Sequence, residues 1–358
     1  MERLAWRQVL LPVLAVVLGL VSGAILIFVS GDNPMTAYGG MLEGAFGDTD
    51  AFGRTLEKAT PLVMGGLAVA FAFKAGLFNI GGQGQLLLGA AFSAWVGFRF
   101  GLPAPIHIPL ALLVGGIVAS GLGALAGLLK ATRGTHEVIS TIMLNFVAAN
   151  LTDWLVSRDG PWNDPDGGAL ARSPLIQDSA VLPKVGGLPT GFLVAVAAAV
   201  VMWWLVSRST LGFEVLTVGS NAKAANYAGI SVTRITVLAM GISAFLAGLG
   251  GAIQTLGVNE RFEPGFNTGL GFDGITIALL ARTNALAVIP AALLIGAMDA
   301  GSTLMQARTD VEPEVISVIQ AFILFFVAAP SVVRWIVRLR AGDDEPAIDL
   351  GAGWGAAT

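Results

Sequence analysis

The sequence predicts an all-α fold, a polytopic transmembrane helical bundle of about ten spans in which some helices are short or broken. Of the 358 residues, 55% are apolar and only 12% are charged, whereas soluble globular proteins carry roughly 25% charged residues. The apolar residues gather in runs long enough to cross a bilayer. The 47 glycines fit the close packing of transmembrane helices.

Ten apolar runs follow one another along the chain. The first comes after Arg3 and Arg7. It is too long for a signal peptide and lacks a small-residue cleavage site, so we expect a spanning helix. Two of the runs are short, around 272–283 and 286–302, and they form either two crossings or a re-entrant hairpin. The runs lie at 9–30, 59–77, 82–100, 106–129, 138–156, 190–206, 235–257, 272–283, 286–302 and 314–336.

The basic residues predict the orientation of the bundle. With the N-terminus inside, the inner segments hold 12 of the 20 lysines and arginines, and the longer outer segments are rich in Asp and Glu. This positive-inside bias places both termini in the cytoplasm. We expect one transmembrane domain over 1–340 and a disordered cytoplasmic tail over 341–358.

Two loops differ from simple connections. The outer loop 157–189 contains strong turn chemistry over 161–168, and its length predicts either disorder or a docking surface. The inner loop 207–233 predicts a two-turn helix, with Asn221 as N-cap and Gly229 as C-cap. So short a helix is marginal in water by itself. It is therefore either a simple connector or a surface on which a partner packs.

A polar break, Phe78 to Gln85, separates two apolar runs with three glycines and three amides. Lipid offers no hydrogen bonds to a broken backbone or a bare amide, so this stretch is buried in protein or lines a wet path. Amides in such places either bind a neutral polar solute or join helices by hydrogen bonds. The candidates for a solute path are Asn79, Gln83, Gln85, Asn145 and Asp273.

A weak internal repeat accompanies this break. Residues 78–81 read Phe-Asn-Ile-Gly, and residues 266–269 read Phe-Asn-Thr-Gly. The expected topology puts the two copies on opposite sides of the membrane, which is what an inverted repeat predicts.

Several kinds of chemistry are excluded by composition. No Gly-Lys dipeptide occurs, so a phosphate-binding GxxxxGK[ST] loop is absent. Zero cysteines exclude thiolate sites, and the two histidines are 29 residues apart. We expect no catalytic residues, no metal ligands and no cofactor. The ionisable residues within apolar runs are Asp153, Asp273 and Asp299, and none has a basic partner at helical spacing; Asp273 is equally well explained as a helix cap.

Four segments in order resemble the permease subunits of bacterial nucleoside-type ABC importers, within the wider class that serves ribose-type sugars and branched-chain amino acids. They are 70–85, 136–145, 218–230 and 271–280. The resemblance covers about residues 55–335.

The resemblance implies a division of labour among several chains. The partners would be cytoplasmic ABC ATPase subunits, a second homologous permease and an extracytoplasmic substrate-binding lipoprotein, with a small-molecule solute and no nucleic acid. The loop 207–233 would hold the coupling helix seated on the ATPase, and the loop 157–189 would contact the binding protein. The ATPase-coupling residues would be Asn221, Lys223, Ala224, Ala225, Tyr227 and Gly229.

The expected function is therefore import of nucleosides by alternating access across a bacterial plasma membrane, powered by separate ATPase subunits. Two alternatives remain open. One is a permease for simple sugars of the ribose type, and the other is an ion-coupled secondary transporter.

Overall fold

The computed structural model describes residues 2–167, 170–265, 269–309, 311–312 and 314–337. The regular secondary structure of the described chain is helical apart from one short antiparallel hairpin, in which Lys184 pairs with Pro189 and Val185 with Leu188. In chain order the elements are α1 (Glu2–Val29), α2 (Pro34–Phe46), α3 (Thr49–Lys74), α4 (Gly82–Arg99), α5 (Ala104–Arg133), α6 (Glu137–Val156), η1 (Asp178–Ala180), β1 (Lys184–Val185), β2 (Leu188–Pro189), α7 (Thr190–Arg208), α8 (Thr210–Ser220), α9 (Ala222–Tyr227), α10 (Val232–Gln254), η2 (Thr255–Asn259), α11 (Leu270–Leu280), α12 (Val288–Arg308), α13 (Glu314–Ala328) and α14 (Pro330–Val337).

The predicted helical bundle is confirmed, and each of the ten apolar runs coincides with a helix. The number of crossings is smaller than the number of runs. Seven helices of the described chain are long and apolar enough to span a membrane, or up to eight if the bent pair α13–α14 is one span. α11 has only 11 residues, too few to cross a bilayer. Two helices, α2 and α8, lie in segments that the sequence predicts to be loops.

Helices α3 and α10 form the centre of the bundle. In their apolar windows 83% and 72% of the residues are buried, against 22% in α7. α10 packs along α5 and α4. A Cβ on Gly248 of α10 would collide with Ala119 of α5, so the small residues allow the close approach that the glycine content predicted.

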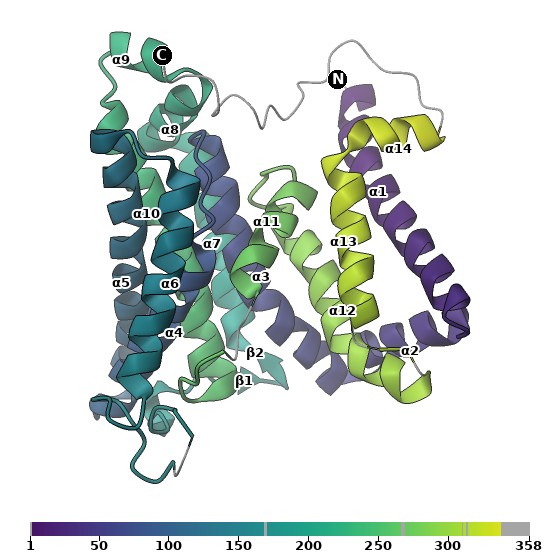
Figure 1. Ribbon diagram of the computed structural model, residues 1–358, viewed down its shortest axis with the longest axis horizontal. Helices are drawn as coiled ribbons and strands as arrows, with labels where there is room; N and C mark the ends of the chain where they lie inside the picture. The colour runs from purple at the N-terminus through teal and green to yellow at the C-terminus, as the bar shows by residue number, and fades with distance from the viewer. Residues whose placement is uncertain (1, 168–169, 266–268, 310, 313, 338–358) are drawn as a thin grey trace.

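A second group of helices, α1, α2, α12, α13 and α14, stands on one side of this centre (Figure 1). α1 packs on α13, where Gly19 and Gly23 face Ile323 and Ile319. The run 314–336, expected to be one span, is bent by 89° between α13 and α14. Pro330 explains the bend, because a proline cannot continue the hydrogen-bond ladder of α13 but suits the first position of a new helix.

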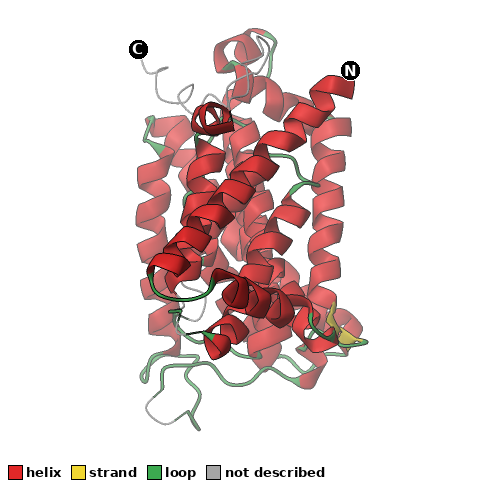
Figure 2. Cartoon of the chain, turned by 90° about the vertical axis from the view of Figure 1, so that its right-hand side faces the viewer, coloured by secondary structure: helices red, strands yellow, loops and turns green. Residues whose placement is uncertain are grey.

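The bundle has two distinct ends. Figure 1 places α9 and the beginning of α1 at one end, here called the α9 end, and the hairpin β1–β2 at the opposite end, here called the hairpin end. Figure 2 shows the same hairpin seen from the side, next to loops that close that end. The elements expected to serve two different partners therefore lie at opposite ends of the molecule.

Candidate functional site

The polar break between α3 and α4 is buried, and the side chain of Asn145 bonds to two of its backbone groups. Asn145 of α6 accepts a hydrogen bond from the Gly84 N–H at 2.9 Å, and its amide donates to the Ile80 carbonyl at 2.9 Å. This single side chain satisfies one donor and one acceptor that the break removes from helical bonding. Asn145, expected in a solute path, thus lies directly against the broken backbone.

Glu137 supports the same break from the start of α6. Its side chain is 3% exposed; it accepts a bond from the Phe78 N–H at 3.4 Å and pairs with the Lys130 ammonium at 2.6 Å. The pairing offsets the large penalty of burying a carboxylate. Glu137 belongs to the segment 136–145 but was not a candidate, because its partners lie on other elements.

Asn79 and Gln85 hold each other in the interior. Their amides form two reciprocal hydrogen bonds, Asn79 Nδ2 to Gln85 Oε1 at 2.8 Å and Gln85 Nε2 to Asn79 Oδ1 at 2.9 Å. Asn79 Nδ2 also donates to the Ser243 hydroxyl at 2.8 Å, and that hydroxyl donates to the Ala68 carbonyl at 2.7 Å. The chain of bonds ties the break to α10 and α3. Both amides are buried, at 2% and 1% exposure, and a solute role for them stays a prediction.

The helices α4 and α11 begin side by side. The Gly271 N–H donates to Gln83 Oε1 at 3.0 Å, and a Cβ on Gly82 would lie 2.9 Å from the Gly271 oxygen. Gly274 touches Gly65, about 13 Å along α3 from its end at Lys74 at 1.5 Å per residue. The two helix N-termini therefore meet inside the bundle rather than at its surface.

The two copies of the internal repeat were expected on opposite sides of the membrane, and this expectation is wrong for their described residues: α4 and α11 begin side by side, so the ends of the two copies meet inside the bundle. Gly81 and Gly269, the last residues of the two copies, occupy the positions before α4 and α11; residues 266–268 lie outside the described chain. α4 runs toward the hairpin end and α11 toward the α9 end (Figure 1). Of the two, α11 is short and α4 has 18 residues; helix N-termini that meet inside a bundle in this way are also found at the binding sites of transporters built from inverted repeats.

Asp273 stands in the first turn of α11. The preceding cap position is Gly269, which has no side chain to offer the free N–H groups. A negative charge in this turn is favourable because of the helix dipole. Of the predicted solute-path residues, the structure places Asn79, Gln83, Gln85 and Asn145 around the break, and Asp273 one turn beyond the joint between α4 and α11.

The loop 157–189 is held in place over its described part. Ser173 exchanges two hydrogen bonds with Phe262, and the Leu182 N–H donates to the Leu256 carbonyl at 2.8 Å. Trp162 stacks on Trp95 of α4 with ring centroids 5.9 Å apart. Of the two predicted alternatives, disorder does not describe this part of the loop. The loop is fastened to the segment that leads from α10 toward α11.

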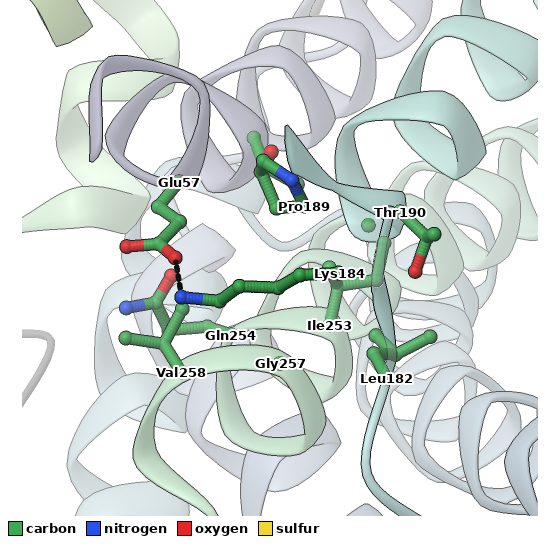
Figure 3. A pocket seen from close by; sticks show the side chains of 11 residues that line it. Glu57, Leu182, Lys184, Pro189, Thr190, Ile253, Gln254, Gly257 and Val258 are labelled. Carbon is green, nitrogen blue, oxygen red and sulfur yellow. Dashed lines mark ion pairs between the residues drawn. The ribbon is translucent and has the colours of Figure 1, made fainter. Parts of the chain in front are cut away.

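The hairpin at the end of this loop is joined to α3 by an ion pair. Figure 3 shows Lys184 of β1 reaching Glu57, with a nitrogen–oxygen distance of 2.6 Å. Gln254 and Val258 of the α10 end lie beside this pair in the same crevice. The hairpin, α3 and α10 thus converge at one point.

The predicted two-turn helix is present as α9. Asn221 caps it, accepting a bond from the Ala224 N–H at 3.0 Å. The helix ends at Tyr227 with Ala228 as its C-cap, and Gly229, the expected cap, follows one residue later with φ of 83°. Ala225 is buried, whereas Tyr227 is 93% exposed. Apart from Ala225, the helix presents its side chains outward, including the expected coupling residues Lys223 and Ala224.

The helix pair α8–α9 touches the backbone at the end of α3. A Cβ on Gly219 would collide with the Lys74 carbonyl oxygen, and a Cβ on Gly76, which has φ of 69°, would lie 3.2 Å from the Gly219 oxygen. No larger residue fits between these backbones. Gly219 of α8 is therefore in direct contact with the chain that leads from α3 into the break at Phe78.

A polytopic helical bundle with broken helices meeting inside it, and with a projecting helix at one end, defines a membrane transport protein. Comparison with known families sharpens this class. The chain belongs to the family described as branched-chain amino acid transport system / permease component, which matches residues 51–328. It is a multi-pass membrane component of an ABC transport system.

Several characterised relatives resemble the chain over nearly its whole length. The guanosine ABC transporter permease protein NupP of Bacillus subtilis is 40% identical, covering 92% of this chain and 96% of its own. The nucleoside ABC transporter permease protein NupB of Lactococcus lactis is 34% identical over 92% and 93%. The glucose ABC transporter permease protein TsgB13 of Haloferax volcanii is 35% identical over 96% and 94%. No solved structure matches the chain.

Proposed function

We propose that this chain is the membrane permease of an ABC importer for nucleosides. The observation that carries the proposal is the likeness to guanosine and nucleoside permeases at 40% and 34% identity over 92% of the chain. The sequence has no Gly-Lys dipeptide and so no phosphate-binding loop of its own. ATP is therefore hydrolysed by separate subunits, and family membership leaves the ion-coupled alternative without support.

The ATPase subunits would bind at the α9 end. The exposure of α9 supports this placement: Tyr227 is 93% exposed, and the other side chains of the helix apart from Ala225 also face outward. In this orientation the α9 end is cytoplasmic, in agreement with the distribution of basic residues. Both termini then lie in the cytoplasm.

The hairpin end would face outward and receive the substrate-binding lipoprotein. The loop 157–189 is suited to this because it is held rigidly, by Trp162 and by the bonds between Ser173 and Phe262. Rigid loops bind a partner with less loss of conformational entropy than disordered ones. A second permease, identical or homologous, would complete the path.

Transport would proceed by alternating access. ATP binding would move the ATPase surface on which α9 rests. The contact between Gly76 and Gly219 would pass this movement to the break at Phe78. The Gln83–Gly271 bond joins that break to α11, so α4 and α11 shift relative to each other. Such a cycle needs only that the two conformations differ in free energy when ATP is bound.

A second candidate function is import of a simple sugar. It is favoured by the glucose permease of Haloferax volcanii, 35% identical over 96% of this chain. The two candidates share the architecture and the partners, and differ only in the solute.

Uptake by the reconstituted system distinguishes them. Proteoliposomes would contain this chain, its partner permease and its ATPase, with the binding protein outside and ATP inside. We expect uptake of labelled guanosine that unlabelled nucleosides suppress and glucose does not. Uptake of glucose alone would overturn the nucleoside assignment in favour of the second candidate.

A further inference from the structure

An open cavity of about 700 Å³ lies between α2, α3 and α12 near the hairpin end. The cavity is separate from the joint between α4 and α11. It is also separate from the crevice of Figure 3, although Glu57 borders both the cavity and that crevice. The lining of the cavity is rich in polar residues for a space between membrane helices. The charged residues that line it are Glu43, Asp48, Arg54, Glu57, Lys58 and Asp299.

Half of these charges are already engaged by neighbours. Glu43 pairs with Arg308 at 2.6 Å, and Glu57 pairs with Lys184 at 2.6 Å. Asp48 caps α3 through a bond from the Ala51 N–H at 2.6 Å. With these partners counted, the acidic and basic groups around the cavity are equal in number. A neutral solute with many hydrogen-bonding groups suits such a lining better than an anion or a cation.

Asp299 is positioned across the cavity from two cations. It lies on α12, where its Oδ1 accepts a bond from the Gln320 amide of α13 at 2.7 Å. Arg54 and Lys58, one turn apart, are exposed on the facing helix α3. Asp299, Arg54 and Lys58 all line the cavity, so one carboxylate and two cations border the same space.

The depth of Asp299 fits a position inside a path. Nine residues separate it from Arg308 at the hairpin end of α12, about 13 Å of helix. An ionisable residue at this depth in a span is expensive to keep and marks a solute or ion pathway more often than a structural site. None of the described residues that line the cavity is aromatic, so the lining offers no ring on which a nucleobase would stack.

We propose that the α2–α3–α12 cavity binds the sugar hydroxyls of the solute, with the Asp299 carboxylate accepting hydrogen bonds from adjacent hydroxyls and the Lys58 ammonium donating to them. This inference rests on the proposed import function and deepens it. Gln320 is a positioning residue, because it holds one Asp299 oxygen and leaves the other for the solute. The cavity selects the sugar half of the solute, whichever base or substituent that sugar carries.

The first test compares a nucleoside with its analogue that lacks the ring hydroxyls. Uptake of guanosine and of 2′,3′-dideoxyguanosine is measured in the full complex for wild type, Asp299→Asn and the matched control Asp153→Asn, whose carboxylate is exposed on α6. Hydrogen bonds to charged groups support about a tenfold preference. We expect Asp299→Asn to lose that preference by slowing guanosine alone. The control should keep it.

The binding protein is the same in all preparations and therefore cancels from the comparison. An equal loss for both solutes in Asp299→Asn, or an unchanged preference, would overturn the inference while leaving nucleoside import intact. Failure of the wild-type complex to take up guanosine at all would instead contradict the proposed function.

The second test needs neither the binding protein nor turnover. The chain contains no cysteine, so Thr303→Cys, exposed and lining the cavity, introduces a single thiol. We expect guanosine to slow its reaction with a membrane-impermeant thiol reagent in the assembled complex, and dideoxyguanosine to leave it unchanged. Adding Asp299→Asn should abolish the protection. Equal protection by both compounds would contradict recognition of the hydroxyls.

Discussion

At the scale of single residues, the break between α3 and α4 persists because side chains replace the lost backbone bonds. Asn145 accepts a hydrogen bond from the Gly84 N–H and donates one to the Ile80 carbonyl. The side chains of Asn79 and Gln85 bond to each other, and Asn79 also bonds to Ser243. In a span, an unsatisfied polar group costs several kcal/mol. The first role of these amides is therefore to stabilise an interrupted backbone inside the bundle.

Replacing Asn79 tests this role. We expect Asn79→Leu to destabilise the protein by about 1–3 kcal/mol for each polar group left without a partner, chiefly the Gln85 amide and the Gly81 N–H, which donates to Asn79 Oδ1 at 3.0 Å. The midpoint of thermal unfolding in detergent should fall accordingly. The control is Asn150→Ala, since Asn150 is exposed and bonds only to Phe146 in its own helix. An Asn79→Leu protein as stable as the control would refute the structural role.

The same residues show which features of the site can be predicted from the sequence and which cannot. The break itself is visible, because three glycines and three amides interrupt an apolar chain. The reciprocal pairing of Asn79 with Gln85 depends on how the backbone turns between them, and no periodicity encodes it. Asp299 and Gln320 come from different helices, and Lys58 from a third. Contacts between elements require the packing that only the folded chain supplies.

At the scale of elements, α9 is a short helix whose coupling role stays a prediction. It is six residues long, and its N-cap Asn221 and buried Ala225 hold it to the molecule. Its cap signals are local, which is why the sequence predicted it. The sequence did not predict α2, of 13 residues, or α8, of 11 residues, because both lie outside the long apolar runs. The bend after α13 was not predicted either, although Pro330 marks its place.

A proline in α9 tests coupling. Ala225→Pro removes a backbone donor, since the Ala225 N–H bonds to the Asn221 carbonyl at 3.0 Å, and an interior proline costs a helix about 3 kcal/mol. We expect normal membrane insertion but at least a tenfold loss of ATPase stimulation by loaded binding protein.

The matched control is Ala222→Pro in the same helix. Ala222 is the first helical residue, where proline is tolerated, and Asn221 before it is already extended at φ −161° and ψ 100°. Stimulation should be largely retained. Equal stimulation in the two variants would exclude a coupling role for α9.

At the scale of the whole molecule, the two ends of the bundle carry different elements. The α9 end carries the projecting helix, and the hairpin end carries the held loop 157–189 together with the α2–α3–α12 cavity. Between them, α4 and α11 start from one joint and run in opposite directions. This arrangement lets one joint respond to events at both ends.

The orientation predicts a labelling pattern. In the cysteine-free background, Val185→Cys on the exposed hairpin and Ala228→Cys beside α9 each add one thiol. In intact cells a membrane-impermeant maleimide should label Val185→Cys alone, and permeabilised cells should show both labelled. The reverse pattern would place the α9 end outside and exclude ATPase binding there.

The central claim is that this chain provides a path whose movement is powered from α9 by another subunit. The most direct measurement is labelled guanosine uptake into proteoliposomes that hold the complete complex, with internal ATP and no ion gradient. We predict uptake with ATP in the wild type and none in Ala225→Pro, and no uptake by this chain alone under a proton or sodium gradient. Gradient-driven uptake by the isolated chain, or ATP-driven uptake that survives in Ala225→Pro, would contradict the claim.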